Sequence, residues 1–380
     1  MVKECHICGT DADAPLLHYF LECEATGTLR SKLNIHPTRA AALDAKSTAT
    51  IIVRKAVEDW DTLCIYIRHP DNVIKTRLKP VRGNLAIEEK VNMSEAEARH
   101  RAGVMQGGFS SPQHCVARWS LAVIVPYRNR ETQIGAFLNH MHPFLQRQQL
   151  NYSIYFVEQE GSAPFNRASL LNVGFKEARK EGPWDCYAFH DVDLLPENDF
   201  HLYHCSPQPR HLAVALSTFN YSSLYFSHRI PYHSYFGGGC LMMESHILKV
   251  NGWSNMYWGW GCEDDDMWNR VTSSDMTVWR YPNPYVRYKM IQHRPAAPNQ
   301  ERHKLMAHSV ERLRTDGLNS LVYSVINTTR YPLYTNILAH ISPSAPNIFT
   351  TVKSTTVKST TVKSTTVKST TVSNPHPHPT

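Results

Sequence analysis

Asp185-Cys186-Tyr187-Ala188-Phe189-His190-Asp191-Val192-Asp193 is the stretch from which the fold of this chain is best read. The run from residue 185 to residue 189 is short and largely apolar, which is typical of a buried strand, and two carboxylates follow it. An Asp-x-Asp pair at the end of a strand can hold a divalent cation through oxygen ligands, and that cation can bridge a diphosphate. The same pattern also occurs in surface turns, so the pair alone does not establish a metal site.

Strand and helix patterns alternate around this stretch. Residues 121–125 form a continuous apolar strand and residues 152–157 a second one. Two helices are predicted by apolar residues at helical spacing, and Pro143 predicts a break in the first of them. The apolar residues are Ile134, Phe137, Leu138, Met141 and Leu145 in the first helix and Leu170, Leu171, Val173, Phe175 and Ala178 in the second. This order predicts an α/β fold with a mostly parallel central sheet and helices on both faces.

In such a fold, ligands bind beyond the carboxyl ends of the strands. Asp193 is predicted to lie at that edge, and so is the turn that carries Arg128 and Arg130. The two phosphates of a sugar nucleotide need positive charge, which these arginines or Arg167 can supply. For each arginine, the alternative is a structural salt bridge.

A second acidic cluster ends the stretch Tyr257-Trp258-Gly259-Trp260-Gly261-Cys262-Glu263-Asp264-Asp265-Asp266. Acids are stabilising in the first turn of a helix, so one interpretation is a solvated helix start. The other is a site for a polar ligand or a metal. The two indoles favour the second interpretation, because we expect them to form an apolar wall beside hydrogen-bond acceptors. A wall of that kind suits a sugar, whose C–H face stacks while its hydroxyls donate.

Composition sets broad limits on the 380-residue chain. The formal net charge of +7 is modest and arises in part from the tail, so we do not expect the main domain to bind nucleic acid. The nine cysteines are an odd number, which leaves at least one without a partner in the chain. Asn-x-Ser/Thr triplets at Asn92, Asn151, Asn220 and Asn327 are compatible with a secretory lumen. The chain contains no run of about 18 apolar residues, so we expect no transmembrane helix, and the N-terminus has no secretory signal pattern.

The two ends of the chain differ from its middle. Residues 1–70 contain Cys5, Cys8, His18 and Cys23, a possible zinc ligand set, although scattered thiols in a small helical piece are the alternative. This segment resembles the zinc-binding tail of some retrotransposon proteins, and we interpret it as foreign to the rest of the chain. Residues 71–118 are interpreted as a stem that leads into the domain. Residues 342–380 contain, from residue 350, several repeats of Thr-Thr-Val-Lys-Ser that bury too little to fold, so we expect a disordered tail.

Taken together, six ordered motifs resemble the β-1,4-galactosyltransferase family over roughly residues 80–341. They are Val125-Pro126-Tyr127-Arg128-Asn129-Arg130, Phe165-Asn166-Arg167-Ala168, Asp191-Val192-Asp193, Tyr235-Phe236-Gly237-Gly238, Trp258-Gly259-Trp260-Gly261 with the acids from Glu263 to Asp266, and Asp316-Gly317-Leu318-Asn319-Ser320.

The resemblance implies a catalytic domain of the GT-A type over residues 119–341. It implies transfer of galactose from UDP-galactose, with inversion, to the 4-hydroxyl of a terminal N-acetylglucosamine on glycoprotein or glycolipid glycans. Manganese would be the cofactor, and the Golgi lumen or membrane the location, although the membrane anchor expected of the family is not found in this chain. The alternatives are glucose or xylose as acceptor, UDP-N-acetylgalactosamine as donor, or a sugar-binding pseudoenzyme.

The resemblance also implies roles for individual residues. Asp264 and Glu263 would be the catalytic residues, with Asp264 as the base and with Glu263 and Asp265 holding the sugars. The implied metal ligands are Asp193, Met290 and His293. The donor would be bound by Pro126, Tyr127, Arg128, Arg130, Phe165, Arg167, Asp191, Val192, Asp193, Tyr235, Trp260 and Gly261. The acceptor would be bound by Phe219, Tyr232, Trp260, Asp264, Asp265, Arg302 and His303. Cys186 and Cys205 match a disulfide pair of the family.

Three departures from the family pattern concern the acceptor side. Cys262 stands where a glycine is usual, and His303 stands where an aromatic ring is expected. Residues 222–229 resemble an insertion. These changes put the identity of the acceptor in doubt and leave the donor chemistry in place. Tyr235 matches the position that favours galactose over N-acetylgalactosamine.

Overall fold

The computed structural model of this chain describes residues 83–113, 115–221, 232–281, 285–293 and 296–342. The predicted zinc ligands Cys5, Cys8, His18 and Cys23 lie outside the described residues, as do the insertion at 222–229 and the tail beyond residue 342. Among the residues described, no helix is both long enough and apolar enough to cross a membrane.

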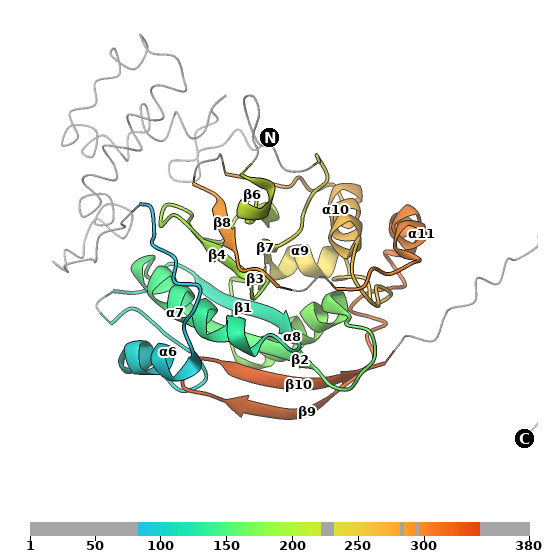
Figure 1. The fold of residues 1–380 in the computed structure, drawn as a ribbon. Coiled ribbons are helices and arrows are strands. Elements are labelled where there is room, and N and C mark those ends of the chain that lie inside the picture. The colour runs from blue at the N-terminus through green and yellow to red at the C-terminus, as the bar shows by residue number, and fades with distance from the viewer. Residues whose placement is uncertain (1–82, 114, 222–231, 282–284, 294–295, 343–380) are drawn as a thin grey trace, which may run out of the picture. The chain divides into compact units, whose positions relative to one another are not determined.

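Seven strands form the main sheet, in the order β5-β7-β3-β1-β2-β10-β9 (Figure 1). Their bounds are β1 Ser120–Tyr127, β2 Asn151–Gln159, β3 Cys186–His190, β5 Arg210–His211, β7 Gly239–Met243, β9 Tyr323–Arg330 and β10 Thr335–Ile341. The inner strands β3, β1, β2 and β10 run parallel, whereas β7, β5 and β9 are added antiparallel at the two sides. The predicted α/β class with a parallel centre is confirmed.

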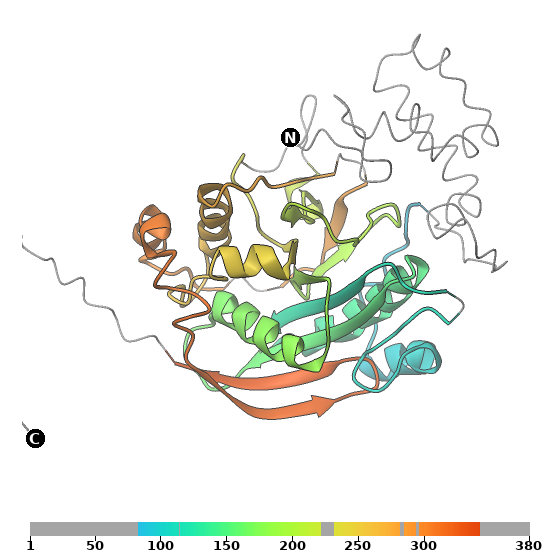
Figure 2. The ribbon, with the colours of Figure 1, turned by 180° about the vertical axis from the view of Figure 1, so that it is seen from behind.

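The sheet is covered by a helix on each face because side chains alternate along a strand. In β1, Leu121 and Val123 belong to a core cluster that includes helix α7 (Glu131–Arg147). Ala122 and Ile124 point the other way, into a second cluster with helix α8 (Arg167–Glu181). Figure 1 shows α7 in front of the sheet, and Figure 2, from behind, shows α8 there.

The predicted break at Pro143 is wrong, because α7 continues through this residue to Arg147. A proline inside a helix lacks a hydrogen bond and costs about 3 kcal/mol. The turn that follows buries the side chains of Phe144 and Leu145 completely. Burying two large apolar side chains contributes roughly 1.5–3 kcal/mol each, which offsets the cost of the proline.

The remaining elements surround the carboxyl ends of the strands and the outer face of α7. A second sheet, in the order β4-β8-β6, consists of β4 Leu194–Pro196, β8 Arg287–Met290 and β6 Ala215–Leu216. The other helices are α6 Met93–His100, α9 Glu244–Lys249, α10 Glu263–Ser273, α11 Arg302–Ala307 and α12 Ser309–Arg312, with short 3-10 turns η2 Arg101–Gly103 and η3 Ser217–Phe219. Helix α6 packs on α7 and buries Ala96, so part of the predicted stem contributes to the core.

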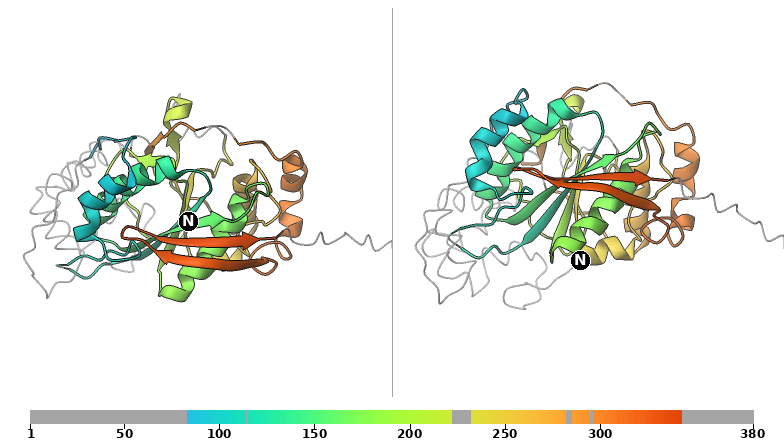
Figure 3. Two further views of the ribbon diagram at one scale, coloured as in Figure 1. Left: turned by 60° about the horizontal axis from the view of Figure 1, so that its bottom comes forward. Right: turned by 90° about the horizontal axis from the view of Figure 1, so that it is seen from below.

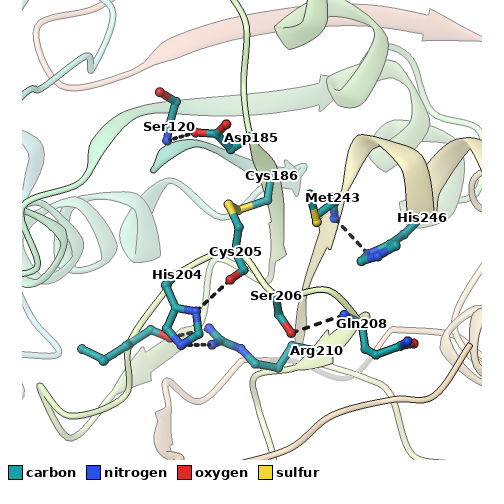
Figure 4. Close-up of a disulfide and its surroundings, with 11 residues drawn as sticks. Ser120, Asp185, Cys186, His204, Cys205, Ser206, Gln208, Arg210, Met243 and His246 are labelled. Carbon is teal, nitrogen blue, oxygen red and sulfur yellow. Dashed lines mark hydrogen bonds between the residues drawn. A yellow bond between two sulfur atoms is a disulfide. The ribbon is translucent and has the colours of Figure 1, made fainter. Parts of the chain in front are cut away.

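A disulfide joins Cys186, the first residue of β3, to Cys205, and confirms the predicted pair. Figure 4 shows the bond with Asp185 at the start of the strand and with His204 and Arg210 nearby. Of the cysteines in the described part of the chain, Cys115, Cys240 and Cys262 are not in disulfides. The bond ties the segment after β4 to the centre of the main sheet.

We predict that the double variant Cys186→Ala/Cys205→Ala loses about 3 kcal/mol of unfolding free energy, because the bond closes a loop with a sequence separation of 19. Urea unfolding under oxidising conditions measures the loss, with Cys115→Ala as the control. Reduction should remove most of the difference between the double variant and the wild type. An equally large difference after reduction would show that packing around the two side chains, and not the crosslink, accounts for the loss.

Candidate active site

Arg167, the first residue of α8, brings the two acidic clusters of the sequence together. Its Nε donates to Asp191 Oδ1 at 2.7 Å, and its Nη1 lies 3.6 Å from Glu263 Oε1. The helix begins here because the side chain of Asn166 accepts a hydrogen bond from the backbone N–H of Ser169. The guanidinium also lies over the ring of Trp253, 5.5 Å from its centroid. The arginine predicted to serve phosphates therefore pairs with carboxylates in this structure.

The four acids from Glu263 to Asp266 form the first turn of α10, as one of the two interpretations predicts, but they are not solvated. The side chain of Glu263 is 12% exposed and that of Asp266 is fully buried. Cys262 precedes the helix with φ of 68°, in the left-handed region that glycine adopts without steric cost. The family's glycine at this position thus has a conformational reason, and the cysteine adopts the same conformation.

Burial raises the pKa of several carboxyls in this site. It raises the pKa of Glu263 to about 7, to which the charge of Asp264 adds while Arg167 opposes it. Burial likewise raises the pKa of Asp191 to about 6 against the opposing charge of Arg167, and the pKa of Asp265 to about 6. The pKa of Asp264 is also raised by burial and lowered in part by Arg167. Carboxyls poised to exchange protons near neutral pH are typical of catalytic sites.

Asp266 faces away from the other acids into a buried ionic network. Its two oxygens pair with Arg270 Nε at 2.5 Å and with Arg312 Nη2 at 3.0 Å. Asp316 completes the network by pairing with both arginines, and Tyr257 Oη donates to Asp266 at 2.9 Å. This network holds the buried side of α10 in place. It therefore determines how the helix is rotated about its axis and where Glu263, Asp264 and Asp265 lie.

Asp264 lies against the glycine turn of the Tyr235-Phe236-Gly237-Gly238 motif. A Cβ at Gly237 would fall 2.4 Å from Asp264 Oδ2, so only glycine permits this close approach. The same Cβ would fall 2.9 Å from Cε2 of Tyr235, which places that ring beside Asp264. Tyr232 Oη donates to Asp265 Oδ2 at 3.2 Å. The structure thus brings Tyr235, Tyr232 and the acids together, although they are separated in the sequence.

The predicted metal ligands lie at the edge where β4 and β8 pair. Asp193 Oδ2 is 2.7 Å from His293 Nε2. Leu194 pairs with Met290 in the antiparallel register, and the N–H of Ile291 donates to the carbonyl of Asp193 at 2.8 Å. Within the described ranges, no cluster of three or more His, Cys, Asp or Glu side chains suits a metal ion. The predicted ligand set contains only two residues of these types, Asp193 and His293, because its third member is the thioether of Met290.

Two arginines follow β1 at the same edge of the sheet. Arg130 Nη2 donates to His293 Nδ1 at 3.0 Å. Arg128 Nη1 donates to the carbonyls of Gly161 and Ala163, and its guanidinium lies over Phe165. The predicted donor residues Pro126, Tyr127 and Val192 have buried side chains.

The prediction that two indoles form one wall is wrong. Trp258 is partly buried against the second core cluster, whereas Trp260 is 61% exposed. Gly259, which separates the two indoles, has φ of 94°, so the backbone between them is not extended. One exposed indole remains next to the acids of α10.

The predicted acceptor residues occupy two places. Arg302 and His303 begin α11 and lie against the aromatic loop: a Cβ at Gly261 would meet Arg302 Cδ at 2.8 Å. His303 Nδ1 is 3.8 Å from the sulfur of Cys262, so the two departures from the family pattern contact each other. Phe219 is exposed at the end of η3, a turn that contacts β8.

Sequence reasoning missed the residues that position the site. No sequence motif marks Arg270 or Arg312, and Asp316 belongs to a family motif without a predicted role. The Asp266–Arg270 spacing of four is a pairing signal on a helix and points to one of these contacts. The contact of Asp316 with α10 had no local signal.

We predict that replacing Glu263 by Gln stabilises the protein more at neutral than at acidic pH. With its pKa raised to about 7 from 4.5, folded Glu263 binds more protons than the unfolded chain between these values, so its stabilising effect is lost as pH rises. Urea unfolding gives the free energy of unfolding of each protein. The difference in this free energy, variant minus wild type, should be larger at about pH 7 than at about pH 5 by on the order of 1–3 kcal/mol.

The comparison between variant and wild type is needed because buried histidines such as His190 also titrate in this range, equally in both proteins. Glu301→Gln, at a side chain 65% exposed, is the control and should show no such change. A stability difference between Glu263→Gln and the wild type that does not vary with pH would contradict the prediction.

Known proteins resemble the chain in both sequence and fold. The model for the N-terminal region of glycosyl transferase group 7 matches residues 75–206, and the model for the N-terminal domain of galactosyltransferase matches residues 210–294. The catalytic domain of Drosophila β-1,4-galactosyltransferase 7, in complex with xylobiose, is 28% identical, with a TM-score of 0.50. That match covers 59% of this chain and 94% of the fly domain. The fold is of the GT-A type, as predicted.

Among curated relatives, human β-1,4-galactosyltransferase 1 is 45% identical over 251 residues, which are 65% of this chain and 61% of the human protein. β-1,4-galactosyltransferase 4 of Cricetulus griseus is 46% identical over 258 residues, 67% of this chain and 72% of the relative. The chain thus spans about three fifths of the human relative. The family models begin at residue 75 and give no support to a zinc tail in residues 1–70. On the matches of these family models over residues 75–294 and of these relatives, the chain belongs to the β-1,4-galactosyltransferase family.

Proposed function

We propose that this protein transfers galactose from UDP-galactose, with inversion, to the 4-hydroxyl of a terminal N-acetylglucosamine. The observation that carries the proposal is the meeting of two groups of acids around Arg167, in a chain of this family. Asp191 contacts Arg167 and lies two residues before the predicted metal ligand Asp193. Glu263 lies near Arg167 and directly before the predicted base Asp264. Donor and acceptor chemistry would then occur on two sides of one arginine.

The three predicted ligands fit manganese. A carboxylate, a thioether and an imidazole form a mixed donor set, whereas calcium and magnesium prefer oxygen alone. Asp193 Oδ2 and His293 Nε2 already face each other at 2.7 Å, and the β4–β8 register places Met290 beside Asp193. When bound, manganese supplies positive charge that stabilises the departing diphosphate.

The contact between Arg130 and His293 would link the position of the ring proton on His293, a predicted metal ligand, to the binding of the sugar nucleotide. A guanidinium can only donate, so His293 Nδ1 is an acceptor in the contact with Arg130 and the ring proton is on Nε2. Nε2 must lose this proton to become a ligand, and the neutral ring then carries its proton on Nδ1. Nδ1 can then no longer accept from Arg130, whose guanidinium can turn to a phosphate oxygen.

Asp264 is suited to act as the base. Its raised pKa makes the carboxylate a better proton acceptor than an exposed aspartate, while Arg167 keeps the ionised form accessible. In the proposed reaction, Asp264 accepts the proton of the acceptor hydroxyl as that oxygen attacks the anomeric carbon of galactose. Asp265, held by Tyr232, and Glu263 would accept hydrogen bonds from the sugar hydroxyls.

The exposed Trp260 is proposed to stack on the sugars from the loop before α10. Its backbone bonds to Ala297 and Asn299 join this loop to the segment that leads into α11, where Arg302 and His303 lie. Glucose or xylose as acceptor, and N-acetylgalactosamine as donor sugar, are the alternatives. The Cys186–Cys205 bond supports a location in an oxidising compartment such as the Golgi lumen.

We expect the wild type to transfer galactose from UDP-galactose to N-acetylglucosamine when manganese is present, more efficiently than to glucose or xylose. Asp193→Ala should lose at least about a hundredfold in kcat/KM and bind manganese more weakly, because one charged ligand is removed. Radiolabelled transfer assays measure the first effect and electron paramagnetic resonance of free manganese the second. Full activity of Asp193→Ala in chelator-treated buffer would contradict the metal assignment, and absence of transfer by folded wild type would contradict the enzyme.

Donor choice depends on Tyr235, which lies beside Asp264 with its ring 5.7 Å from that of Tyr232. A large side chain beside C2 of the donor sugar rejects an acetamide by steric clash. Tyr235→Leu should therefore raise kcat/KM for UDP-N-acetylgalactosamine relative to UDP-galactose by at least about tenfold.

Tyr232→Leu is the matched control, since Tyr232 contacts Asp265 on the proposed acceptor side, and it should leave the donor ratio unchanged. If Tyr235 only packs under the glycine turn, Tyr235→Leu would lose stability and both activities together. An unchanged donor ratio in Tyr235→Leu would refute the assignment.

A further inference from the structure

Strand β9 forms an outer edge of the main sheet and, among the strands that the structure describes, pairs with β10 alone (Figures 1 and 3). It is eight residues long, and its exposed side chains include Val325 and Ile326, the latter 53% exposed. A long exposed edge of this kind can pair with another chain, and proteins commonly prevent this with lysine, proline or a bulge. β9 contains neither lysine nor proline.

A bulge does occur in β9, at its centre. Leu338 of β10 pairs with Asn327, but the next residue, Ala339, pairs with Val325, so Ile326 is the extra residue. A bulge interrupts the ladder locally and leaves the rest of the edge able to pair. The residue directly after the bulge is Asn327, the first residue of the triplet Asn327-Thr328-Thr329.

The two side chains that define this triplet are accessible and lie together. Residues two apart in a strand point to the same side. Asn327 Nδ2 donates to Thr329 Oγ1 at 2.9 Å, and Asn327 is exposed. A large substituent on Nδ2 would extend from the edge into solvent without displacing a core residue.

The other triplets of the same type are placed differently. Asn151 lies in β2, its Nδ2 donates to Ser120 Oγ at 3.0 Å, and the required hydroxyl residue Ser153 is buried. Asn92 caps α6 in a capping box with Glu95. For Asn220, the required hydroxyl residue Ser222 lies outside the described ranges. Asn327 is thus the triplet whose folded position best tolerates a substituent among those that the structure describes completely.

We infer that Asn327 carries an N-linked glycan that covers the edge of β9. In the step that attaches it, Nδ2 of Asn327 forms a bond to the anomeric carbon of an oligosaccharide carried on a lipid diphosphate. The bond from that carbon to the phosphate oxygen breaks, the lipid diphosphate leaves with the electron pair, and Nδ2 loses one proton. The inference requires passage through an oxidising lumen, which the Cys186–Cys205 bond supports, and does not depend on galactose transfer.

Expression of the full chain behind a cleavable secretion signal in animal cells tests the site. We expect peptide mass spectrometry of the wild type, after enzymatic glycan release in heavy-oxygen water, to find conversion of Asn327 to labelled Asp. Asn327→Gln and Thr329→Val should remove one glycan, whereas Thr329→Ser should retain it. Unmodified Asn327 in the secreted wild type, or glycans only at Asn92 or Asn220, would overturn the inference, and the wild-type measurement holds even if a variant misfolds.

Self-association tests the covering of the edge. Enzymatic release would leave a charged Asp at position 327, so the neutral variant Asn327→Gln is used here. Asn327→Gln should shift the protein from monomer toward larger species in sedimentation velocity. Adding Ile326→Lys to Asn327→Gln should restore the monomer, because a charge on the edge opposes pairing. Adding Leu248→Lys, at a side chain 48% exposed on α9, is the matched control and should not prevent association. An Asn327→Gln variant that remains monomeric would show that the glycan does not protect the edge.

Discussion

The geometry of the site depends on the position of one guanidinium. Arg167 lies between Asp191, at the end of a central parallel strand, and Glu263, at the start of α10. Carboxylates taken out of water repel each other and favour their protonated forms, which a cation between them counteracts. Because α8 places this arginine at the carboxyl edge of the sheet, the helix cap at Asn166 and the cation over Trp253 together determine where the two acidic clusters meet.

The acids of α10 divide into two groups with opposite energetic effects. Asp266 faces a buried network with Arg270, Arg312 and Asp316, in which each charge has a partner. The other three lie on the side of Arg167, Gly237 and Tyr232, where burial raises their pKa values and disfavours the ionised forms. A site of this kind is less stable without its ligands than an apolar one would be, and the network behind α10 holds the helix in place despite that cost.

Rules based on neighbouring residues predicted the main strands and helices correctly. They failed where contacts between residues distant in the sequence had the larger effect. The period of two in β1 and of 3.6 in α7 and α8 is visible in the sequence, because each reflects burial of one side of an element. The rule that proline ends a helix was wrong at Pro143, since the burial of Phe144 and Leu145 outweighs one lost hydrogen bond. The single wall of Trp258 and Trp260 was wrong because Trp258 packs against the second core cluster whereas Trp260 remains exposed.

By itself, the sequence determined the order of strands and helices, the edge of the sheet where the predicted ligand-binding residues lie, and the family motifs that mark the acids, the arginines and the disulfide pair. These properties follow from residue type and spacing along the chain. Only the tertiary structure decided that Arg167 pairs with Asp191 and Glu263, that Asp266 turns away from the acids next to it, and that Asn327 is exposed while Asn151 is only partly so. The physical reason is that electrostatic energy and burial depend on distances through space, and these residues are neighbours only after the chain has folded.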